Sequence, residues 1–182
     1  LLRKLLGKKM VAVIAGGSYH QFQKQFLPFL KSSDAELKNL FLFPTSATSF
    51  YQRKNKSWKK IYEERLSSPE KKKIKKAFAR AFGEIRYRHP SKTYGKIIED
   101  RASQIAFSAL GQYAPLEGKR KWNKISDQRP KIKAALDRLL PEFEIRLGGL
   151  TSIDITRKGI DKAYGIRQIM KYLRAKKKDV LF

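Results

Sequence analysis

Hydrophobic positions in the first part of the chain fall into short continuous runs and helically spaced sets. Residues 1–6 read as the end of a helix. Residues 9–15 form an apolar run with β-branched members, bounded by glycines at 16–17, which is typical of a buried strand in a parallel sheet. Ser18 then suits the N-cap of a helix over 19–27. A strand, a Gly-Gly-Ser turn and a helix N-terminus form a geometry in which backbone N–H groups can bind an anion.

The next apolar segments predict a strand and a hairpin. Residues 40–43 form a continuous apolar run that stops at Pro44. Segments 49–51 and 58–62 flank Asn55, which suits a hairpin turn. We therefore expect one strand followed by an antiparallel strand pair.

The densest run of lysines lies on a predicted amphipathic helix. Apolar residues recur at helical spacing over 74–82, and the lysines of 71–76 surround that apolar stripe. Ser68 suits the N-cap, and Pro69 suits the first helical position. Two interpretations of the basic face stay open: a solvated helix surface, or a surface for nucleic acid or another partner.

Further patterns predict elements through the second half of the chain. In order, they are strands at 96–99 and 104–108, a helix at 128–140, a strand pair at 143–147 and 151–155, a helix at 161–173, and the start of a strand at 178–182. Parallel α/β signals therefore lie toward the two ends, and paired strands with helices lie between them.

This order predicts an α/β protein whose core is interrupted by an insert. We expect a partial Rossmann-like core of parallel strands in residues 1–61 and 157–182. We expect an inserted α+β cap, with an antiparallel sheet and two helices, in residues 62–156.

Composition excludes several classes of protein. Lys and Arg total 42 and Asp and Glu total 16 among 182 residues, so the net charge is +26. Such an excess attracts polyanions without specificity. The absence of Cys excludes a disulfide scaffold, a Cys-ligated zinc site and a thiol nucleophile, and two His exclude a His-rich metal site. No apolar run approaches the roughly 20 residues of a membrane span.

Two segments near the ends carry a family resemblance. Residues 11–18 and 151–162, together with 98–101, 108–111 and 128–131 in the expected order, resemble the haloacid-dehalogenase-type phosphatases that have the larger α/β cap. Within that superfamily the chain is most similar to eukaryotic-type phosphomannomutases. The resemblance covers nearly the whole chain.

The resemblance implies a phosphate-binding role for residues of the core. Ser18, beside Gly17 in the turn, would donate a hydrogen bond to the transferring phosphoryl oxygens, and Lys162 would neutralise charge on the phosphate. Structural interpretations stay open beside these roles. Ser18 can serve only as a helix cap, and Lys162 can be one surface lysine among many.

The resemblance also implies a substrate-binding role for residues of the cap. Arg101, Ser152 and Asp154 match positions that hold the sugar phosphate and the sugar hydroxyls, and the planar fork of an arginine suits a phosphate. Structural alternatives stay open. Arg101 can be a structural residue in an ion pair, and Ser152 and Asp154 can simply face solvent.

A departure from the pattern favours a phosphatase over a mutase. Gln112 stands where the mutase pattern has an arginine, and the next arginine of that pattern falls near Lys119 or Arg120. A mutase must hold both ends of a bisphosphate, so the loss of one phosphate-binding arginine argues for hydrolysis.

The carboxylate motifs of the family are missing. No Asp-x-Asp pair occurs in the sequence, and the acidic Mg²⁺-binding loop would follow Val180–Phe182. We therefore expect Mg²⁺ and its ligands only in a longer parent protein, and we expect this chain to be inactive as it stands.

Two functions from different classes follow. The first is a Mg²⁺-dependent phosphatase or phosphomutase, cytoplasmic, that acts on a phosphorylated sugar or similar metabolite. The alternative is a non-catalytic, strongly basic protein associated with nucleic acid or with a structural role on the same fold. Aromatic residues interleaved with basic ones, at 51–54 and 58–60, could stack on single strands in that case. A membrane-surface protein is disfavoured because no helix has a broad exposed apolar face.

Overall fold

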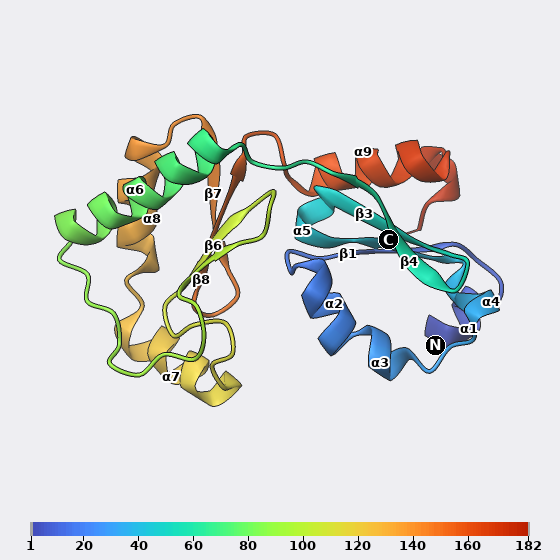
Figure 1. Cartoon of the computed structure of the whole chain (residues 1–182), viewed down its shortest axis with the longest axis horizontal. Helices are drawn as coiled ribbons and strands as arrows, with labels where there is room; N and C mark the ends of the chain where they lie inside the picture. Colours follow the sequence, from blue (N-terminus) through green and yellow to red (C-terminus); the bar gives the residue numbers. More distant parts are fainter. Residues whose placement is uncertain (1, 182) are drawn as a thin grey trace. The chain divides into compact units, whose positions relative to one another are not determined.

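The computed structural model describes residues 2–181, except for the side chain of Lys162. The chain divides into two compact units, residues 1–64 with 159–182, and residues 65–158 (Figure 1). Each observed boundary lies one or two residues beyond the end of a strand, β4 (Ser57–Glu63) or β8 (Ser152–Arg157). Both lie slightly later than the predicted boundaries at 61–62 and 156–157, because each strand continues past the predicted point.

The first unit contains a four-stranded sheet with the order β1-β2-β3-β4. The three strands that join β4 are β1 (Val11–Ile14), β2 (Leu40–Phe43) and β3 (Ser49–Lys54). β1 pairs with β2 in parallel, whereas β2 with β3 and β3 with β4 are antiparallel. Asn55 and Lys56 have φ of 49° and 58°, so a left-handed turn joins β3 to β4 as the position of Asn55 predicts.

Helices cover both faces of this sheet. They are α1 (Leu2–Leu6), α2 (Tyr19–Gln25), α3 (Leu27–Leu30), α4 (Asp34–Leu37), α5 (Pro44–Ala47) and α9 (Lys162–Leu173), followed by the 3₁₀ turn η1 (Lys177–Asp179). Leu40 and Leu42 pack with Phe22 on one face, whereas Phe41 and Phe43 pack with Ile169 of α9 on the other. The continuous apolar run of β2 therefore has a structural reason, since both faces of that strand are buried.

Two expectations for the first unit are wrong. β1 was expected to be buried, but it is the edge strand of the sheet, and Ile14 at its end is 40% exposed. The described residues 178–181 form no strand. α9 ends at Arg174 in a left-handed conformation, and Asp179 accepts a hydrogen bond from the backbone N–H of Lys176, which closes a 3₁₀ turn instead.

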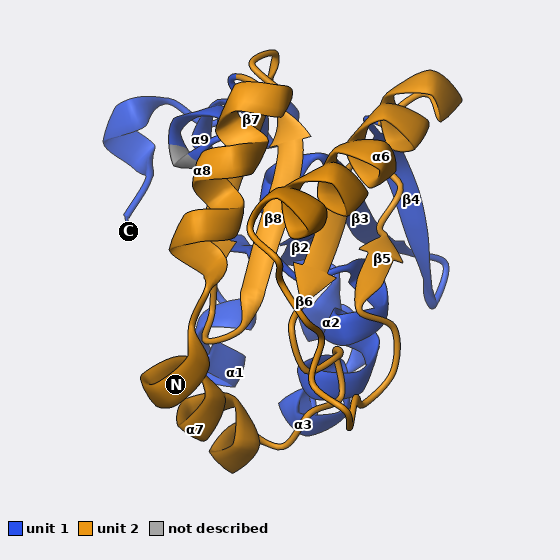
Figure 2. Cartoon of the chain, turned by 90° about the vertical axis from the view of Figure 1, so that its left-hand side faces the viewer, with its two compact units in different colours: residues 1–64, 159–182 blue, residues 65–158 orange. Residues whose placement is uncertain are grey.

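The second unit contains an antiparallel sheet with the order β5-β6-β8-β7. Its other elements are α6 (Ser68–Glu84), β5 (Ile98–Asp100), β6 (Ile105–Ser108), α7 (Leu116–Ser126), α8 (Arg129–Leu139) and β7 (Phe143–Gly148). α6 and α8 cover one face of this sheet (Figure 2). Phe107, Ile153 and Ile155 point into the core beneath these helices, so the alternate residues of β6 and β8 lie on the opposite face.

The described part of the second unit has a third helix, α7, where two were predicted. Trp122 is the only buried residue of α7, so the segment lacks the apolar spacing that reveals a helix in sequence. The predicted cap of α6 also moves by one residue, from Ser68 to Ser67. The reason is Glu70, which lies three residues after Ser67. The carboxylate of Glu70 accepts a hydrogen bond from the backbone N–H of Ser67 and completes a capping box.

Among residues 2–181, no helix combines the length and the apolar character that crossing a bilayer demands.

An ion pair ties the start of α6 to the end of β8 and predicts sensitivity to acid. Arg157 donates to both carboxylate oxygens of Glu70, at 2.8 and 2.7 Å, and mainly for this reason the pKa of Glu70 falls to about 2. Since the folded-state pKa lies below the ordinary value, the stabilisation is present above about pH 4.5 and is lost as the pH falls toward 2.

We expect Glu70→Gln to lower the free energy of unfolding at neutral pH by about 1 kcal/mol, because the pair is partly exposed. Glutamine still suits the capping box, so the substitution isolates the ion pair. Thermal unfolding at about pH 7 and about pH 3 measures the effect, and the difference between wild type and variant should shrink at the lower pH. Asp137→Asn, on the exposed surface of α8, serves as the control. An equal difference at both pH values would contradict the assignment.

Candidate functional site

The turn after β1 is held by backbone hydrogen bonds from the segment that follows β2. Thr45 N donates to Gly17 O and Ser46 N donates to Ala15 O, both at 2.9 Å. Thr45 and Ser46 can reach these carbonyls because they adopt left-handed conformations, with φ of 49° and 58°. The turn that contains Gly17 and Ser18 is therefore fixed in place by chain far from it in sequence.

Ser18 occupies the predicted position at the start of α2. Its backbone is extended, and its N–H donates to the side-chain oxygen of Gln21 at 2.8 Å. A Cβ at position 17 would lie 2.7 Å from that same oxygen, so Gly17 leaves room for the Gln21 side chain. Ser18 therefore stands at the N-cap position of α2.

The start of α9 lies at the carboxyl end of β1. Asp161 caps the helix by accepting a hydrogen bond from Tyr164 N at 2.6 Å. Gly165 lies so close to β1 and α5 that a methyl group there would collide with Ile14 and touch Ala47. The backbone of Lys162 therefore begins α9 near the strand that leads into the Gly17–Ser18 turn, whereas its side chain lies outside the described part of the structure.

Arg101 and Asp154 come together on the face of the second sheet that α6 and α8 leave uncovered. Asp154 lies opposite Ala106 in the strand register, and Arg101 follows β5. The distance from Arg101 Nη1 to Asp154 Oδ1 is 3.8 Å, and Glu99 orients the same guanidinium by accepting from its Nε at 2.5 Å. Sequence alternation places Ser152 on the same face, opposite Ser108 and Gly148.

Asp154 has an incompletely satisfied carboxylate. Its Oδ1 is buried and has no hydrogen-bond partner among the described residues. Burial raises the pKa of Asp154 more strongly than the nearby charge of Arg101 lowers it. A Cβ at position 148 would lie 2.8 Å from Asp154 Oδ2, so Gly148 keeps the space beside this carboxylate free of a side chain.

Gln104 is a neighbour of this pair that the sequence analysis did not single out. It is 1% exposed, and its side-chain amide lies close enough to Asp154 to lower the pKa of that carboxyl. Its position in the sequence could have revealed it. Gln104 lies two residues before Ala106, the residue opposite Asp154, so alternation places Gln104 and Asp154 on the same face of the sheet.

Lys119 and Arg120 lie on another element, the helix α7. Lys119 Nζ donates to the backbone oxygen of Gln112 at 3.1 Å, whereas Arg120 is exposed. They therefore lie on a different element from Asp154, which is on β8, and from Arg101, which follows β5.

The described residues do not fit a Mg²⁺ site. Mg²⁺ needs carboxylate oxygens in near-octahedral geometry. Within residues 2–181, no group of three or more His, Asp or Glu side chains gathers in a way that could hold a metal ion.

Comparisons with known proteins agree with this architecture. The family model described as eukaryotic phosphomannomutase matches residues 1–178. No sequence relative was found among curated proteins. Solved structures with the same fold include a Plasmodium falciparum IMP-nucleotidase, with 13% identity, a TM-score of 0.63, and coverage of 98% of this chain and 46% of that one.

Two further structures show similar values. The C-terminally truncated form of that nucleotidase has 15% identity and a TM-score of 0.64, and the match covers 98% of this chain and 53% of that one. The C-terminal domain of a Candida albicans trehalose synthase regulatory protein has 10% identity and a TM-score of 0.54, with 97% and 55% covered. The chain therefore spans about half the length of the proteins it resembles, and at these identities the likeness shows the fold alone.

Proposed function

The chain belongs to the eukaryotic phosphomannomutase family, and from that premise we propose that the protein hydrolyses or transfers the phosphoryl group of a phosphorylated sugar or a similar metabolite. Hydrolysis is the favoured reaction, because Gln112 stands where the mutase pattern has a phosphate-binding arginine. Solved proteins of the same fold include an IMP-nucleotidase, whose name also denotes a phosphorylated small molecule.

The observation that carries the proposal is the buried Oδ1 of Asp154, which has no hydrogen-bond partner among the described residues and lies 3.8 Å from Nη1 of Arg101. A buried acceptor without a hydrogen bond costs free energy unless a ligand supplies the donor. A sugar hydroxyl is such a donor, and Arg101 can at the same time donate to a phosphate oxygen. The two groups together suit a molecule that carries hydroxyls and a phosphate.

The first unit would bind the group that is transferred. Ser18 would donate to a phosphoryl oxygen from the turn that Thr45 holds in place, and Lys162 would supply positive charge from the start of α9. Both roles are electrostatic, and positioning with charge stabilisation accounts for most of the catalysis in phosphoryl transfer. Mg²⁺ dependence is a prediction of the family resemblance, and since the described residues hold no metal cluster, no step is assigned to a metal.

We expect Asp154→Asn to lower kcat/KM for the best substrate roughly 10- to 100-fold, mainly through KM. The reason is that the charged acceptor becomes a neutral amide, and hydrogen bonds to charged groups contribute about 1.5–3 kcal/mol. The measurement is release of inorganic phosphate from a panel of sugar phosphates, with Mg²⁺ present and absent, by the full-length protein. Because burial disfavours the carboxylate, the variant should unfold at the same temperature as wild type or higher.

Asp137→Asn, which removes a carboxylate from the exposed surface of α8, is the matched control and should leave the kinetics unchanged. Wild-type protein that releases no phosphate from any member of the panel, and interconverts no sugar 1- and 6-phosphates, would refute the proposed function. Equal losses in the two variants would refute the role of Asp154.

A further inference from the structure

One surface of α6 carries two neighbouring columns of lysines. Lys71 and Lys75 lie one turn apart in one column, and Lys72 and Lys76 lie one turn apart in the next. Ser68 and Ala79 extend these columns, and the six residues line an open hollow of about 540 Å³. The buried apolar residues of α6 point away from these columns into the core, so the lysines add no side chain to that core.

The positive charge of this surface is largely uncompensated. α6 contains six basic and two acidic residues, a net charge of +4. Four acidic residues lie on or beside the helix. Three of them pair with basic side chains outside the columns, and the fourth pairs with one lysine of the columns. They are Glu70 with Arg157, Glu84 with Arg80 and Arg138, Glu142 with Lys73, and Asp100 with Lys71.

Three lysines of the columns have no salt bridge among the described residues: Lys72, Lys75 and Lys76, all exposed. Asp100 is close enough to Lys75 for the lysine charge to lower its pKa, but its carboxylate bonds to Lys71 at 3.0 Å. These three side chains are therefore available to an external anion.

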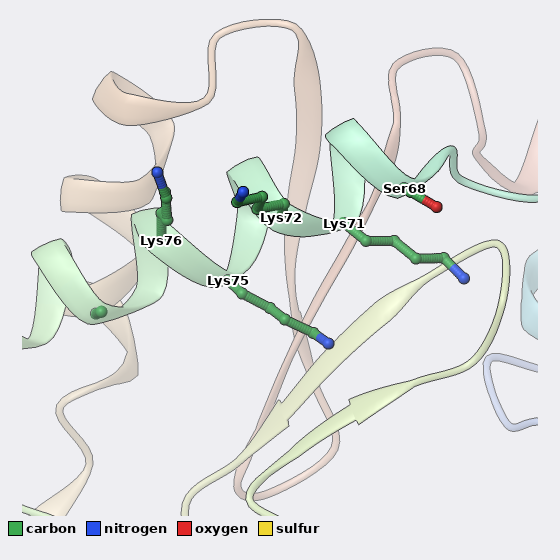
Figure 3. A pocket seen from close by; sticks show the side chains of 6 residues that line it. Ser68, Lys71, Lys72, Lys75 and Lys76 are labelled. Atoms are coloured by element: carbon green, nitrogen blue, oxygen red, sulfur yellow. The ribbon is translucent and has the colours of Figure 1, made fainter.

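The side chains diverge from the helix. Lys71 and Lys75 extend to one side of α6, and Lys76 extends to the other (Figure 3). A small anion needs donors that converge on one point, as the fork of an arginine does. Lysines spread over two turns present a line of point charges, roughly 6 Å apart along each column, which suits a ligand with a series of phosphates.

We propose that this lysine surface of α6 binds the phosphate backbone of a nucleic-acid duplex without regard to sequence. A duplex fits better than a single strand, because the hollow has no aromatic side chain on which an unpaired base could stack. The surface also has no arginine for reading guanine edges, so binding should depend on charge alone. This inference is independent of the catalytic proposal.

The aromatic residues that alternate with basic ones at 51–54 and 58–60 do not form a surface on which the bases of a single strand could stack. Tyr51 is buried, and its ring stacks on Tyr19 at a centroid distance of 3.8 Å. Trp58 is half-buried and packs against the core of the first unit, and the guanidinium of Arg53 lies near its ring. The packing of the first unit therefore accounts for both aromatics.

The test is fluorescence anisotropy of a short labelled DNA duplex of arbitrary sequence, titrated with the full protein over a range of salt concentrations. The triple variant Lys72→Ala, Lys75→Ala, Lys76→Ala should bind at least roughly tenfold more weakly. It should also reduce the slope of log K against log salt by about 3, one for each phosphate contact. Alanine preserves the helix because it has the highest helix propensity, and circular dichroism checks this.

The matched control removes three exposed lysines of the same unit that lie on α7 and α8, Lys121→Ala, Lys124→Ala and Lys131→Ala. It lowers the net charge equally and should change the slope by less than about 1. Equal slopes for both triple variants would overturn the proposal and assign binding to the diffuse net charge. Two other results would overturn the proposal. One is that the wild-type protein binds no duplex at low salt. The other is that it uses these lysines to bind vesicles of anionic phospholipid and does not bind a duplex.

Discussion

Replacing Arg129 with methionine is expected to destabilise the 65–158 unit by about 3 kcal/mol, which corresponds to a fall in Tm of more than roughly 10 °C. Arg129 is 5% exposed and donates to both carboxylate oxygens of Asp127, at 2.8 and 2.7 Å. Its Nη1 also donates to the backbone oxygens of Gly148 and Gly149, at 3.2 and 2.9 Å. One side chain thus joins the start of α8 to the turn between β7 and β8.

Methionine keeps the apolar stem of Arg129 but leaves these acceptors without their donor. The hydrogen bond from Arg129 is the main cause that holds the pKa of Asp127 below its ordinary value. The contribution of the pair is therefore present above about pH 4 and is lost as the pH falls further, so the variant should also lose part of the acid dependence of stability.

Chemical denaturation at neutral and acidic pH measures both effects. The matched control is Arg138→Met, the same substitution on an exposed arginine of the same helix, and it should cost less than about 1 kcal/mol. If Arg129→Met and Arg138→Met were equally stable, the turn between β7 and β8 would not depend on Arg129.

Replacing Gly111 with alanine is expected to destabilise the same unit by about 2–4 kcal/mol. Gly111 has φ of 80°, and a Cβ there would lie 2.6 Å from the carbonyl carbon of Tyr94. Tyr94 cannot withdraw easily, because its N–H donates to Leu110 O and its oxygen accepts from Tyr113 N, at 2.8 and 2.9 Å. The substitution therefore adds strain at residue 111 and displaces backbone that is bonded on both sides.

Gly118→Ala provides the opposite expectation within the same unit. Gly118 lies in α7, and apart from the neighbouring residues and the backbone of its own helix, no atom lies within 4 Å of the position that a Cβ would take. Alanine should raise stability by up to about 1 kcal/mol, because glycine is a poor helix former. Thermal unfolding of the two variants compares them directly, and a Gly111→Ala protein as stable as Gly118→Ala would show that the segment around Tyr94 yields readily.

Much of the element order could be predicted from local patterns. The turn at Asn55 and the parallel pairing of β1 depend on residues close in sequence or on strongly apolar runs, and the structure confirms both. The helix α7 could not be predicted, because its single buried residue, Trp122, produces no periodic signal. The cap at Ser67 required a choice between adjacent serines that the side chain of Glu70 decides.

The candidate site was predictable only in part. Alternation along β8 places Ser152 and Asp154 on one face whatever the rest of the fold does. The distance between Asp154 and Arg101, and the burial of Gln104 beside them, depend on how β5, β6 and β8 pair. No local pattern reports the pairing of β6 with β8, because it joins segments about 50 residues apart.

By itself, the sequence determined the class of the fold, the order of its elements, the family and the excess of positive charge, since periodicity, turn residues and motif spacing are local properties of a chain. The tertiary structure alone decided which charges are already neutralised and which polar atoms lack a partner. Asp100 pairs with Lys71, whereas no acidic side chain among the described residues pairs with Lys72 or Lys76, and the buried Asp154 has one oxygen without a hydrogen bond. The physical reason is that the strength of a charge or a hydrogen bond depends on burial and on the groups that folding brings beside it.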